Sequence, residues 1–237
     1  MSNKIKVAIL DDHQGIIDGY LYRLSDAPDI EVIATLTFGE LLEPAMVQKP
    51  ADVLLLDVQV PTSPTNSNPY PILYLIPRLL QNYPDLAVLV ITMHAQRTLI
   101  QAVMEAGANG YVLKDDQATI RELAAVIRSV ASGGIHMSQY AYQQLLKRDS
   151  GELGLMTLTS RQIEALSLYA AYPDASTKEI ADRMNIANST LRNLLSGAYL
   201  RLDVRNRAAA VAKARQMGII VSNPRSEDLE KYSDEPN

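Results

Sequence analysis

The sequence contains no cysteine and only three histidines among its 237 residues. The missing cysteines exclude disulfide bonds, thiol catalysis and thiolate-bound metals, and three scattered histidines argue against a metal site built from histidine alone. Apolar runs are short, and none approaches the roughly 20 residues that a membrane-spanning helix requires. Residues 1–6 also lack a signal-peptide pattern. These absences predict a globular, cytoplasmic protein with no membrane partner.

Charge is distributed unevenly along the chain, although its net value is only −5. Residues 1–154 hold 11 Lys/Arg and 17 Asp/Glu, residues 155–221 hold 9 and 5, and residues 222–237 hold 2 and 5. The length allows two domains with separate cores. An acidic front and a basic back are typical of modules with different partners, and the basic one is a candidate for binding a polyanion. Many small domains nevertheless reach this charge without binding nucleic acid.

The first 130 residues alternate short apolar runs with longer amphipathic ones. Runs such as Val53–Leu56 and Val88–Ile91 are apolar on both faces, as strands of a sheet covered on both sides must be. Five such βα repeats predict an α/β domain with a five-stranded doubly wound parallel sheet of the flavodoxin-like kind. The predicted strands are Lys6–Leu10, Ile30–Leu36, Val53–Leu56, Ala87–Thr92 and Gly110–Leu113.

Strand patterns end after Ser132, and the remainder of the chain reads as helical. Ser138–Arg148 predicts a short extra helix, and residues 149–154 predict a linker. Thr159 with Gln162 and Ser176 with Glu179 fit capping boxes, while Asn188 or Ser189 would cap a third helix and Asn206 a fourth. The predicted domains are 1–132, an extra helix and linker over 133–154, a small all-α four-helix domain over 155–221, and a disordered acidic tail over 222–237.

Polar residues stand where the predicted strands end: Asp11 and Asp12, Asp57, Thr92, and Lys114. Ligands of open parallel sheets bind at the carboxyl ends of the strands, so we expect these side chains to share one rim. Crowded carboxylates need a cation, and oxygen ligands favour Mg²⁺. With a lysine beside them, this set suffices for Asp57 to accept a phosphoryl group. Any one of these aspartates alone is as well explained by helix capping.

The same positions carry a resemblance that covers the front half of the chain. Four runs closely resemble the receiver domain of response regulators: Ile9-Leu-Asp-Asp-His, Leu54-Leu-Leu-Asp, Val90-Ile-Thr-Met-His and Ala106-Gly-Ala-Asn-Gly-Tyr-Val-Leu-Lys-Asp. The resemblance implies that Asp11, Asp12, Asp57 and the backbone carbonyl of Gln59 bind Mg²⁺. It also implies that Asp57 accepts phosphate from a sensor histidine kinase. Lys114 would pair with the phosphate, and Thr92 and Tyr111 would form the switch.

The loop after Asp57 departs from the receiver pattern. It reads Val60-Pro-Thr-Ser-Pro-Thr-Asn-Ser-Asn-Pro-Tyr-Pro, about seven residues longer than is usual in the family, with three additional prolines and no glycine. Because this loop borders the predicted phosphorylation site, it bears on kinase docking, phosphate lifetime or the dependence on phosphate itself.

The back domain fits a helix-turn-helix, with helices over Thr177–Met184 and Ser189–Leu202 separated by a tight connection. Leu191, Leu194, Leu195, Ala198 and Leu202 form its apolar stripe. Composition alone also suits a helical bundle used for dimerisation. Four runs resemble the LuxR-type output domain of the NarL/FixJ family: Leu158-Thr-Ser-Arg-Gln, Lys178-Glu-Ile-Ala-Asp-Arg-Met, Ser189-Thr-Leu-Arg and Leu202-Asp-Val-Arg-Asn-Arg-Ala.

This resemblance implies double-stranded DNA as a partner and a homodimer in the active state, with the fourth helix, Asn206–Met217, as the dimer surface. Arg192 reads a guanine or contacts phosphate, of which we favour phosphate. The predicted DNA-contacting residues are Lys178, Ser189, Thr190, Arg192, Asn193, Ser196, Arg201, Arg205 and Arg207.

The predicted recognition helix also departs from its family. Leu194 stands where the family has histidine, Gly197 lies in mid-helix, and two extra residues occur near Tyr172. A glycine there costs roughly 0.5–1 kcal/mol relative to alanine, which suggests close approach to DNA or a partner. These departures leave two functions open. The first is a phosphorylation-controlled transcription regulator that is not an enzyme. The second is a receiver-gated regulator whose output binds a protein. An aspartate phosphatase is set aside because the aspartates after the first strand are adjacent.

Overall fold

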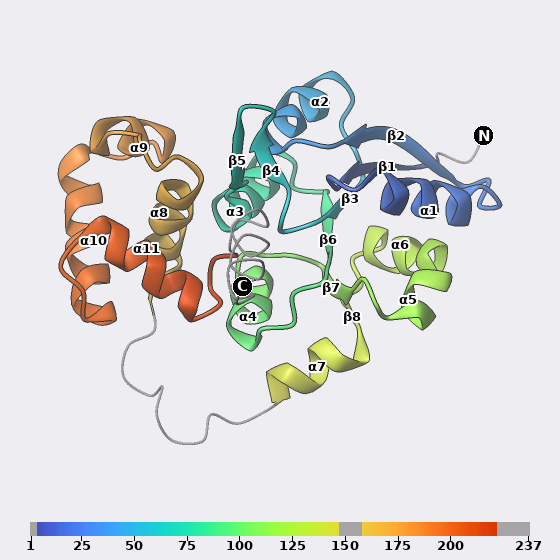
Figure 1. Cartoon of the computed structure of the whole chain (residues 1–237). Coiled ribbons are helices and arrows are strands. Elements are labelled where there is room, and N and C mark those ends of the chain that lie inside the picture. Colours follow the sequence, from blue (N-terminus) through green and yellow to red (C-terminus); the bar gives the residue numbers. More distant parts are fainter. Residues whose placement is uncertain (1–3, 147–157, 222–237) are drawn as a thin grey trace, which may run out of the picture.

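A computed structural model describes residues 4–146 and 158–221, and its main element is a parallel sheet (Figure 1). The sheet follows the order β2-β1-β3-β6-β7-β8. The five predicted strands are confirmed, and four have the predicted bounds. These strands are β1 (Ile5–Leu10), β2 (Ile30–Leu36), β3 (Val53–Leu56), β6 (Ala87–Thr92) and β7 (Gly110–Leu113).

A sixth strand, β8 (His136–Met137), pairs in parallel with β7 at the edge of the sheet. The prediction that strand structure ends at Ser132 is therefore wrong for these two residues. A two-residue strand has no readable alternation, and it forms here because Gly110 lets it approach. A Cβ on Gly110 would lie 2.5 Å from the carbonyl oxygen of His136.

Helices cover both faces of the sheet, as the two-sided apolar strands require. One face packs against α1 (Gln14–Leu24) and α6 (Leu123–Ala131), with α5 (Gln117–Arg121) beside them. The other face packs against α2 (Leu42–Gln48), α3 (Ile72–Asn82) and α4 (Arg97–Glu105), after the short 3-10 helix η1 (Gly39–Leu41). Alternate strand residues separate the two cores, since Val7 and Ile9 lie in the first and Ala8 and Leu10 in the second.

The long loop after Asp57 folds into a two-stranded antiparallel hairpin, β4 (Pro61–Ser63) and β5 (Asn66–Pro69). Besides the ladder between the strands, two further bonds brace the hairpin. The Thr62 hydroxyl donates to the carbonyl of Asn68 at 2.8 Å, and the amide of Tyr70 donates to the carbonyl of Val60 at 2.8 Å. The sequence pattern predicted a longer loop there and no strands. We call residues 61–69 the inserted hairpin.

The predicted extra helix is present as α7 (Gln139–Leu146), which packs against α4 and β7. The predicted linker over 149–154 and the predicted disordered tail over 222–237 lie outside the described residues. Within the two described ranges, no helix is both long and apolar enough to cross a bilayer.

The second domain consists of α8 (Ser160–Ala171), α9 (Thr177–Arg183), α10 (Asn188–Leu202) and α11 (Arg207–Gln216). Both predicted capping boxes are confirmed, at Thr159 and at Ser176, and Asn206 caps α11 through the amide of Ala209. The cap predicted for the third helix is wrong, because the N-cap residue is Ala187 and no side chain caps it. There the chain leaves the tight α9–α10 turn, in which Asn185 has a φ of 52°, one residue earlier than the sequence suggests.

The two domains share one apolar core on the α2–α4 face of the sheet. Buried side chains of α3 and α4 continue into those of α8, α10 and α11 within a single cluster. Among the helices of the second domain, α8 lies closest to α3 and β5 of the receiver. The helix α10 lies on the far side of the second domain (Figure 1). The core residues of the second domain include Leu166, Ile180, Leu191 and Leu202.

Candidate functional site

Four strands of the sheet deliver polar side chains to one rim. Ladder hydrogen bonds continue one residue beyond the strands: the amide of Asp11 donates to Leu36, that of Asp57 to Leu10, and that of Lys114 to Thr92, at 2.8–3.0 Å. These bonds keep the ends of β1, β3 and β7 level with the end of β6. Asp11, Asp57 and Lys114 therefore meet at the carboxyl ends of the strands, where open parallel sheets bind ligands.

Lys114 bridges two buried carboxylates. Its Nζ lies 2.7 Å from Asp11 Oδ2 and 2.7 Å from Asp57 Oδ2, and the three side chains are 8%, 2% and 4% exposed. Burial acts to lower the pKa of Lys114, but the charges of Asp57 and Asp11 outweigh it and raise that pKa above its usual value. Burial also raises the pKa of the Asp11 carboxyl, and the hydrogen bond from Lys114 offsets only part of this. The site thus holds one cation between two anions in a nearly dry environment.

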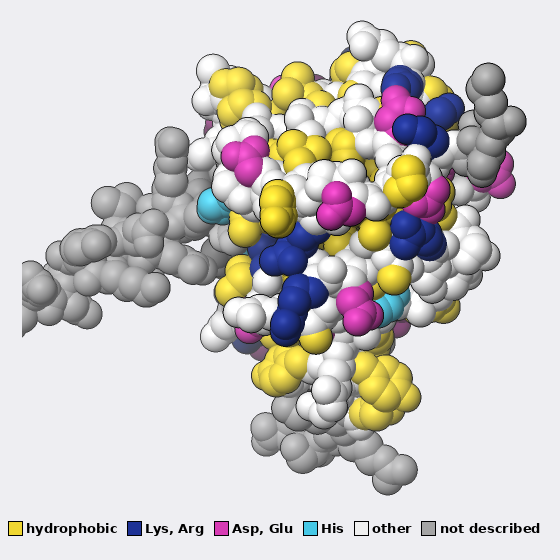
Figure 2. All heavy atoms as spheres, turned by 90° about the vertical axis from the view of Figure 1, so that its right-hand side faces the viewer, with side chains coloured by type: hydrophobic (Ala, Val, Ile, Leu, Met, Phe, Trp, Pro, Cys, Tyr) yellow, Lys and Arg dark blue, Asp and Glu magenta, His cyan; other side chains and the backbone are white. Residues whose placement is uncertain are grey.

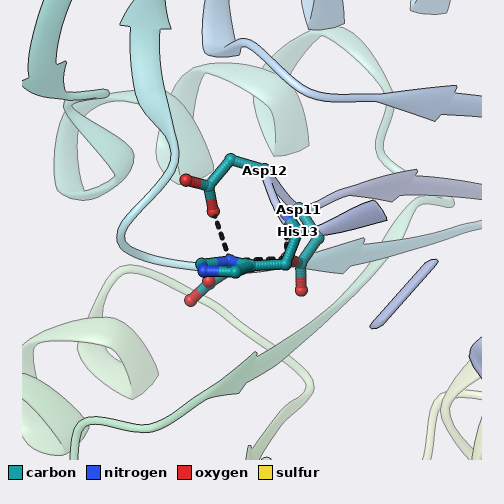
Figure 3. A group of neighbouring side chains, drawn as sticks. Asp11, Asp12 and His13 are labelled. Atoms are coloured by element: carbon teal, nitrogen blue, oxygen red, sulfur yellow. Dashed lines mark hydrogen bonds and ion pairs between the residues drawn. The ribbon is translucent and has the colours of Figure 1, made fainter. Parts of the chain in front are cut away.

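Asp11, Asp12, His13 and Asp57 offer ligand atoms that all lie within 4.8 Å of one another. The His13 amide donates to Asp11 Oδ1 at 3.0 Å, and its Nδ1 lies 2.8 Å from Asp12 Oδ1 (Figure 3). Three carboxylates at this spacing suit a hard divalent cation such as Mg²⁺, which prefers oxygen ligands. His13 was not among the predicted site residues, although its position directly after two aspartates was the available signal.

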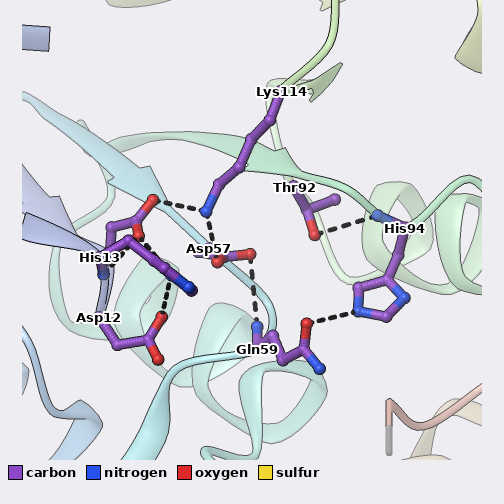
Figure 4. A network of polar contacts seen from close by, with 8 residues as sticks. Asp12, His13, Asp57, Gln59, Thr92, His94 and Lys114 are labelled. Carbon is purple, nitrogen blue, oxygen red and sulfur yellow. Dashed lines mark hydrogen bonds and ion pairs between the residues drawn. The ribbon is translucent and has the colours of Figure 1, made fainter. Parts of the chain in front are cut away.

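A second set of contacts joins Asp57 to Thr92 (Figure 4). The Gln59 amide lies 3.4 Å from Asp57 Oδ1, and the Gln59 side-chain oxygen lies 3.1 Å from His94 Nε2. The His94 amide donates to the Thr92 hydroxyl at 3.3 Å, and Thr92 is fully buried. Gln59 and Thr92 were predicted site residues, whereas His94 was missed because it lies two residues beyond its strand.

Tyr111 reaches the same network from β7. Its ring is fully buried, and its hydroxyl donates to the carbonyl of His94 at 2.8 Å. Burial, together with the charge of Asp57, raises the pKa of the Tyr111 phenol. The structure thus brings every predicted receiver residue into one continuous set of contacts around Asp57.

The second domain presents the outer face of α10. The predicted apolar stripe packs inward, with four members buried and Leu194 partly buried. Eight of the nine predicted DNA-contacting residues are exposed: Lys178, Ser189, Thr190, Arg192, Asn193, Ser196, Arg201 and Arg205. Arg207 is the exception. Its guanidinium donates to the carbonyls of Ala175 and Pro173 at 2.9 Å and lies over the ring of Tyr169, so it stabilises the turn before α9.

A contact inside the second domain explains why Gly197 lies in the middle of α10. A Cβ on Gly197 would lie 2.7 Å from the side-chain nitrogen of Gln162. Gln162 is 3% exposed, accepts a hydrogen bond from Arg201 at 2.9 Å and donates to the carbonyl of Leu194 at 3.3 Å. Gly197 therefore makes room for the buried side-chain amide of Gln162 between α8 and α10. The predicted reason for this glycine was close approach to DNA or a partner.

Comparison with known proteins agrees with this architecture. Residues 7–127 match the family model for the response regulator receiver domain, and residues 156–214 match that for bacterial regulatory proteins of the luxR family. The chain therefore belongs to the NarL/FixJ family of two-component response regulators, which join a receiver domain to a LuxR-type helix-turn-helix. This is a class of DNA-binding transcriptional regulators and not of enzymes.

Two relatives match over nearly their whole length. The transcriptional regulatory protein LnrK of Bacillus subtilis is 31% identical over 92% of this chain and 99% of its own. The DNA-binding transcriptional activator DevR/DosR of Mycobacterium tuberculosis is 30% identical over 90% and 95%. RcsB of Salmonella enterica serovar Typhimurium, solved on the promoter rprA with the phosphomimetic BeF3−, has a TM-score of 0.60 at 22% identity over 89% and 98%, which shows a shared fold.

Proposed function

We propose that this regulator is switched by Mg²⁺-dependent phosphorylation of Asp57 by a sensor histidine kinase, and that the phosphorylated form binds double-stranded DNA as a homodimer. The observation that carries the proposal is the geometry around Asp57. The buried Asp57 carboxylate shares a lysine with Asp11 and stands within reach of one further acidic ligand, Asp12. Phosphoryl transfer requires mainly positioning and charge stabilisation, and these residues supply both.

Each residue of the rim has a defined task in this proposal. Asp11, Asp12, Asp57 and the backbone carbonyl of Gln59 would hold Mg²⁺, which neutralises charge on the transferring phosphoryl group. A carboxylate oxygen of Asp57 forms the new P–O bond while the P–N bond of the kinase phosphohistidine breaks, and the released imidazole takes a proton. Lys114, already paired with Asp57 Oδ2 at 2.7 Å, would then move its contact to a phosphoryl oxygen.

Thr92 and Tyr111 would report the new charge. The Thr92 hydroxyl now accepts from the His94 amide, and the Tyr111 hydroxyl donates to the His94 carbonyl. Movement of Thr92 toward a phosphoryl oxygen breaks the first contact and thereby frees the segment that holds Tyr111. Such a pair is a two-state element biased by a local change of charge.

DNA recognition is assigned to the exposed face of α10. Arg192, Asn193 and Ser196 follow one another along that face, with Ser189 and Thr190 at its amino-terminal end. An amino-terminal half that is exposed and polar is what a recognition helix presents to the major groove. Lys178, Arg201 and Arg205 lie around it as phosphate-contacting cations. The similarity to DevR/DosR, a DNA-binding transcriptional activator, supports the same assignment.

The receiver face opposite the second domain offers a different surface. Figure 2 shows Lys and Arg side chains there interspersed with Asp and Glu. Mixed charge of this kind does not form the continuous basic surface that polyanion binding requires. DNA contact is therefore assigned to the second domain, and a DNA target inside the cell implies a cytoplasmic location.

The experiment that tests this function is selection of duplex genomic fragments by the purified full-length protein. It is carried out with and without Mg²⁺ and a small-molecule phosphodonor, beside an Asp57→Ala control. We expect a two-fold symmetric motif whose enrichment rises with the donor in the wild type and does not change in the control. Enrichment that ignores the donor would remove Asp57 as the trigger. No enrichment in any state would favour the alternative that the output domain binds a protein.

A further inference from the structure

The seam between the two domains has an unusual chemistry. Three helices of the output domain end against the receiver, and a receiver side chain donates a hydrogen bond to a terminal carbonyl of each. The side-chain amide of Asn66 donates to the carbonyl of Ala171 in α8 at 2.8 Å. The Tyr74 hydroxyl donates to the carbonyl of Arg183 in α9, and the Thr98 hydroxyl donates to the carbonyl of Met217 at the end of α11 at 2.7 Å.

These carbonyls are sites that a helix leaves open. The last four carbonyls of an α-helix have no partner within the helix, and they carry the negative end of its dipole. The receiver meets this end with donors and with a cation, since Arg78 donates to the Tyr74 hydroxyl at 2.7 Å. Arg78 also pairs with Glu43 at 3.1 Å, so the seam is complementary mainly in hydrogen bonding, and it spans three separate helices.

An apolar segment reinforces the seam beside Asp57. α11 ends in a Schellman motif, in which Gly218, with a φ of 67°, donates to Arg215 and Ile219 donates to Ala214. This turn directs Ile219–Val221 back onto the receiver, where all three side chains are at most 9% exposed. They line a cavity of about 20 Å³ together with Leu73, Leu99 and Val58, and Val58 is the residue directly after Asp57.

The inserted hairpin also links the segment after Asp57 to the output domain. Its base is anchored in the receiver, because Tyr70 packs directly on Gly39, where no Cβ would fit. Its second strand carries Asn66 to the end of α8. The hairpin therefore begins four residues after Asp57, and its Asn66 contacts the output domain.

We infer that the inserted hairpin and residues 217–221 form a latch that holds the output domain against the receiver until the Asp57 loop moves. This inference rests on the proposed function. A phosphoryl group adds negative charge one residue from Val58. A shift of that loop would disturb both the apolar cavity and the base of the hairpin, and so release both halves of the latch together.

The latch leaves the DNA-reading face of α10 open. That face is exposed in the closed form, and the most extensive contacts of α10 are with α8, α9 and α11. One of the three helices bonded to the receiver is α11, whose carboxyl end is bonded to Thr98 and whose Val211 lines a groove with Asn68 of the hairpin. Closure therefore fixes the position of α11, the proposed dimer surface, and leaves the DNA-reading face accessible.

The absence of native cysteine allows a direct test in the full-length chain. Labels are attached to Tyr22→Cys and Leu200→Cys, at positions 82% and 77% exposed on α1 and α10, and the distance between them is measured by pulsed spin resonance. The test variant combines Asn66→Ala with Thr98→Val. The matched control combines Gln48→Ala with Thr35→Val, which remove an exposed amide and an exposed hydroxyl elsewhere on the receiver.

We expect one narrow distance distribution in the wild type and the control, and a changed, broader distribution in both after addition of Mg²⁺ and a phosphodonor. The test variant should show the changed distribution without donor, and Thr98→Ser in place of Thr98→Val should restore the narrow one. A test variant that matches the control without donor overturns the latch, even if phosphorylation still increases DNA binding. A variant that opens while no form binds duplex DNA keeps the latch and removes the proposed function.

Discussion

At the scale of single residues, the Gln162 side chain explains why position 197 inside α10 is a glycine. Alanine at a mid-helix position is normally favoured over glycine by roughly 0.5–1 kcal/mol. Here the added methyl group would meet the Gln162 amide at 2.7 Å and displace it from its bonds to Arg201 and Leu194. Each such bond contributes about 1 kcal/mol.

We therefore predict that Gly197→Ala lowers the free energy of unfolding by about 1 kcal/mol, the balance of these opposing effects. Urea denaturation followed by circular dichroism measures it. Gly19→Ala is the matched control, because Gly19 lies inside α1 with nothing within 4 Å of its missing Cβ, and it should be stabilising. Equal stabilisation by both substitutions would contradict the role given to Gln162.

Lys114 is the residue on which the buried charges depend. Removing one partner of a buried ion pair typically costs about 3–5 kcal/mol, because the remaining charge is left uncompensated. We predict a loss near the lower end of this range for Lys114→Met at neutral pH in the presence of a chelator. Lys49→Met, which breaks the exposed pair with Glu31, is the control and should change stability little.

The stability lost in Lys114→Met is expected to depend on pH in one direction. Without the lysine, the two buried carboxylates lose their cation, and burial raises the pKa of the Asp11 carboxyl further above that of the unfolded chain. A group with a raised folded pKa stabilises the fold at low pH and loses that contribution as pH rises through the folded pKa. The deficit of the variant should therefore narrow on acidification. A deficit that widens as pH falls would exclude these carboxylates as its source.

At the scale of elements, Arg128 ties α6 to the segment before β2. Its Nε and Nη2 lie 2.7 and 2.8 Å from the two oxygens of Asp29, and this pairing lowers the pKa of Asp29 to about 2. Because the folded pKa is depressed, the pair stabilises the fold above the unfolded pKa of about 3.9. That contribution is lost as pH falls toward 2.

Carboxyl-carbon NMR titration tests this assignment directly. We predict that Asp29 titrates near pH 2 in the wild type and returns to the ordinary range in Arg128→Gln. Arg121→Gln on α5, whose arginine donates to a backbone carbonyl instead, serves as the control and should leave Asp29 unchanged. An ordinary value for Asp29 in the wild type would show that the bidentate pair is not formed in solution.

Elements differed in how far their sequence could predict them. The strands were located closely because runs such as Val53–Leu56 must be apolar on both faces of a covered sheet. The capping boxes at Thr159 and Ser176 were readable because the donors and acceptors lie within four residues. The inserted hairpin was not, since its strands are short, polar and rich in proline, and it is held by Asn66 and Tyr70 through residues distant in sequence.

The same division applies to the functional residues. The strand-end residues Asp11, Asp57 and Lys114 were found because the topology of parallel strands fixes where they meet. His94 was missed, since its contact with Gln59 depends on the path of a loop. Arg207 fits a family position for a DNA contact, yet its donors serve the turn at Pro173 and Ala175, which holds the two extra residues of this chain.

At the scale of the whole molecule, the acidic rim and the exposed face of α10 are separate surfaces joined through one shared core. The central claim is that charge added at Asp57 changes the affinity of α10 for DNA. This makes the effects of Asp57 and Arg192 separable, because one sets the switch and the other supplies the contact. Their substitutions should therefore affect different parts of the same measurement.

The most direct test is the dissociation constant for one selected duplex, measured across a salt series with and without Mg²⁺ and phosphodonor. The account predicts tighter binding of the phosphorylated wild type, and no response to the donor in Asp57→Ala. Arg192→Ala should keep its response to the donor, but bind more weakly and with a shallower dependence on salt. Binding by Asp57→Ala that still tightens with the donor, or Arg192→Ala binding as the wild type does, would contradict the central claim.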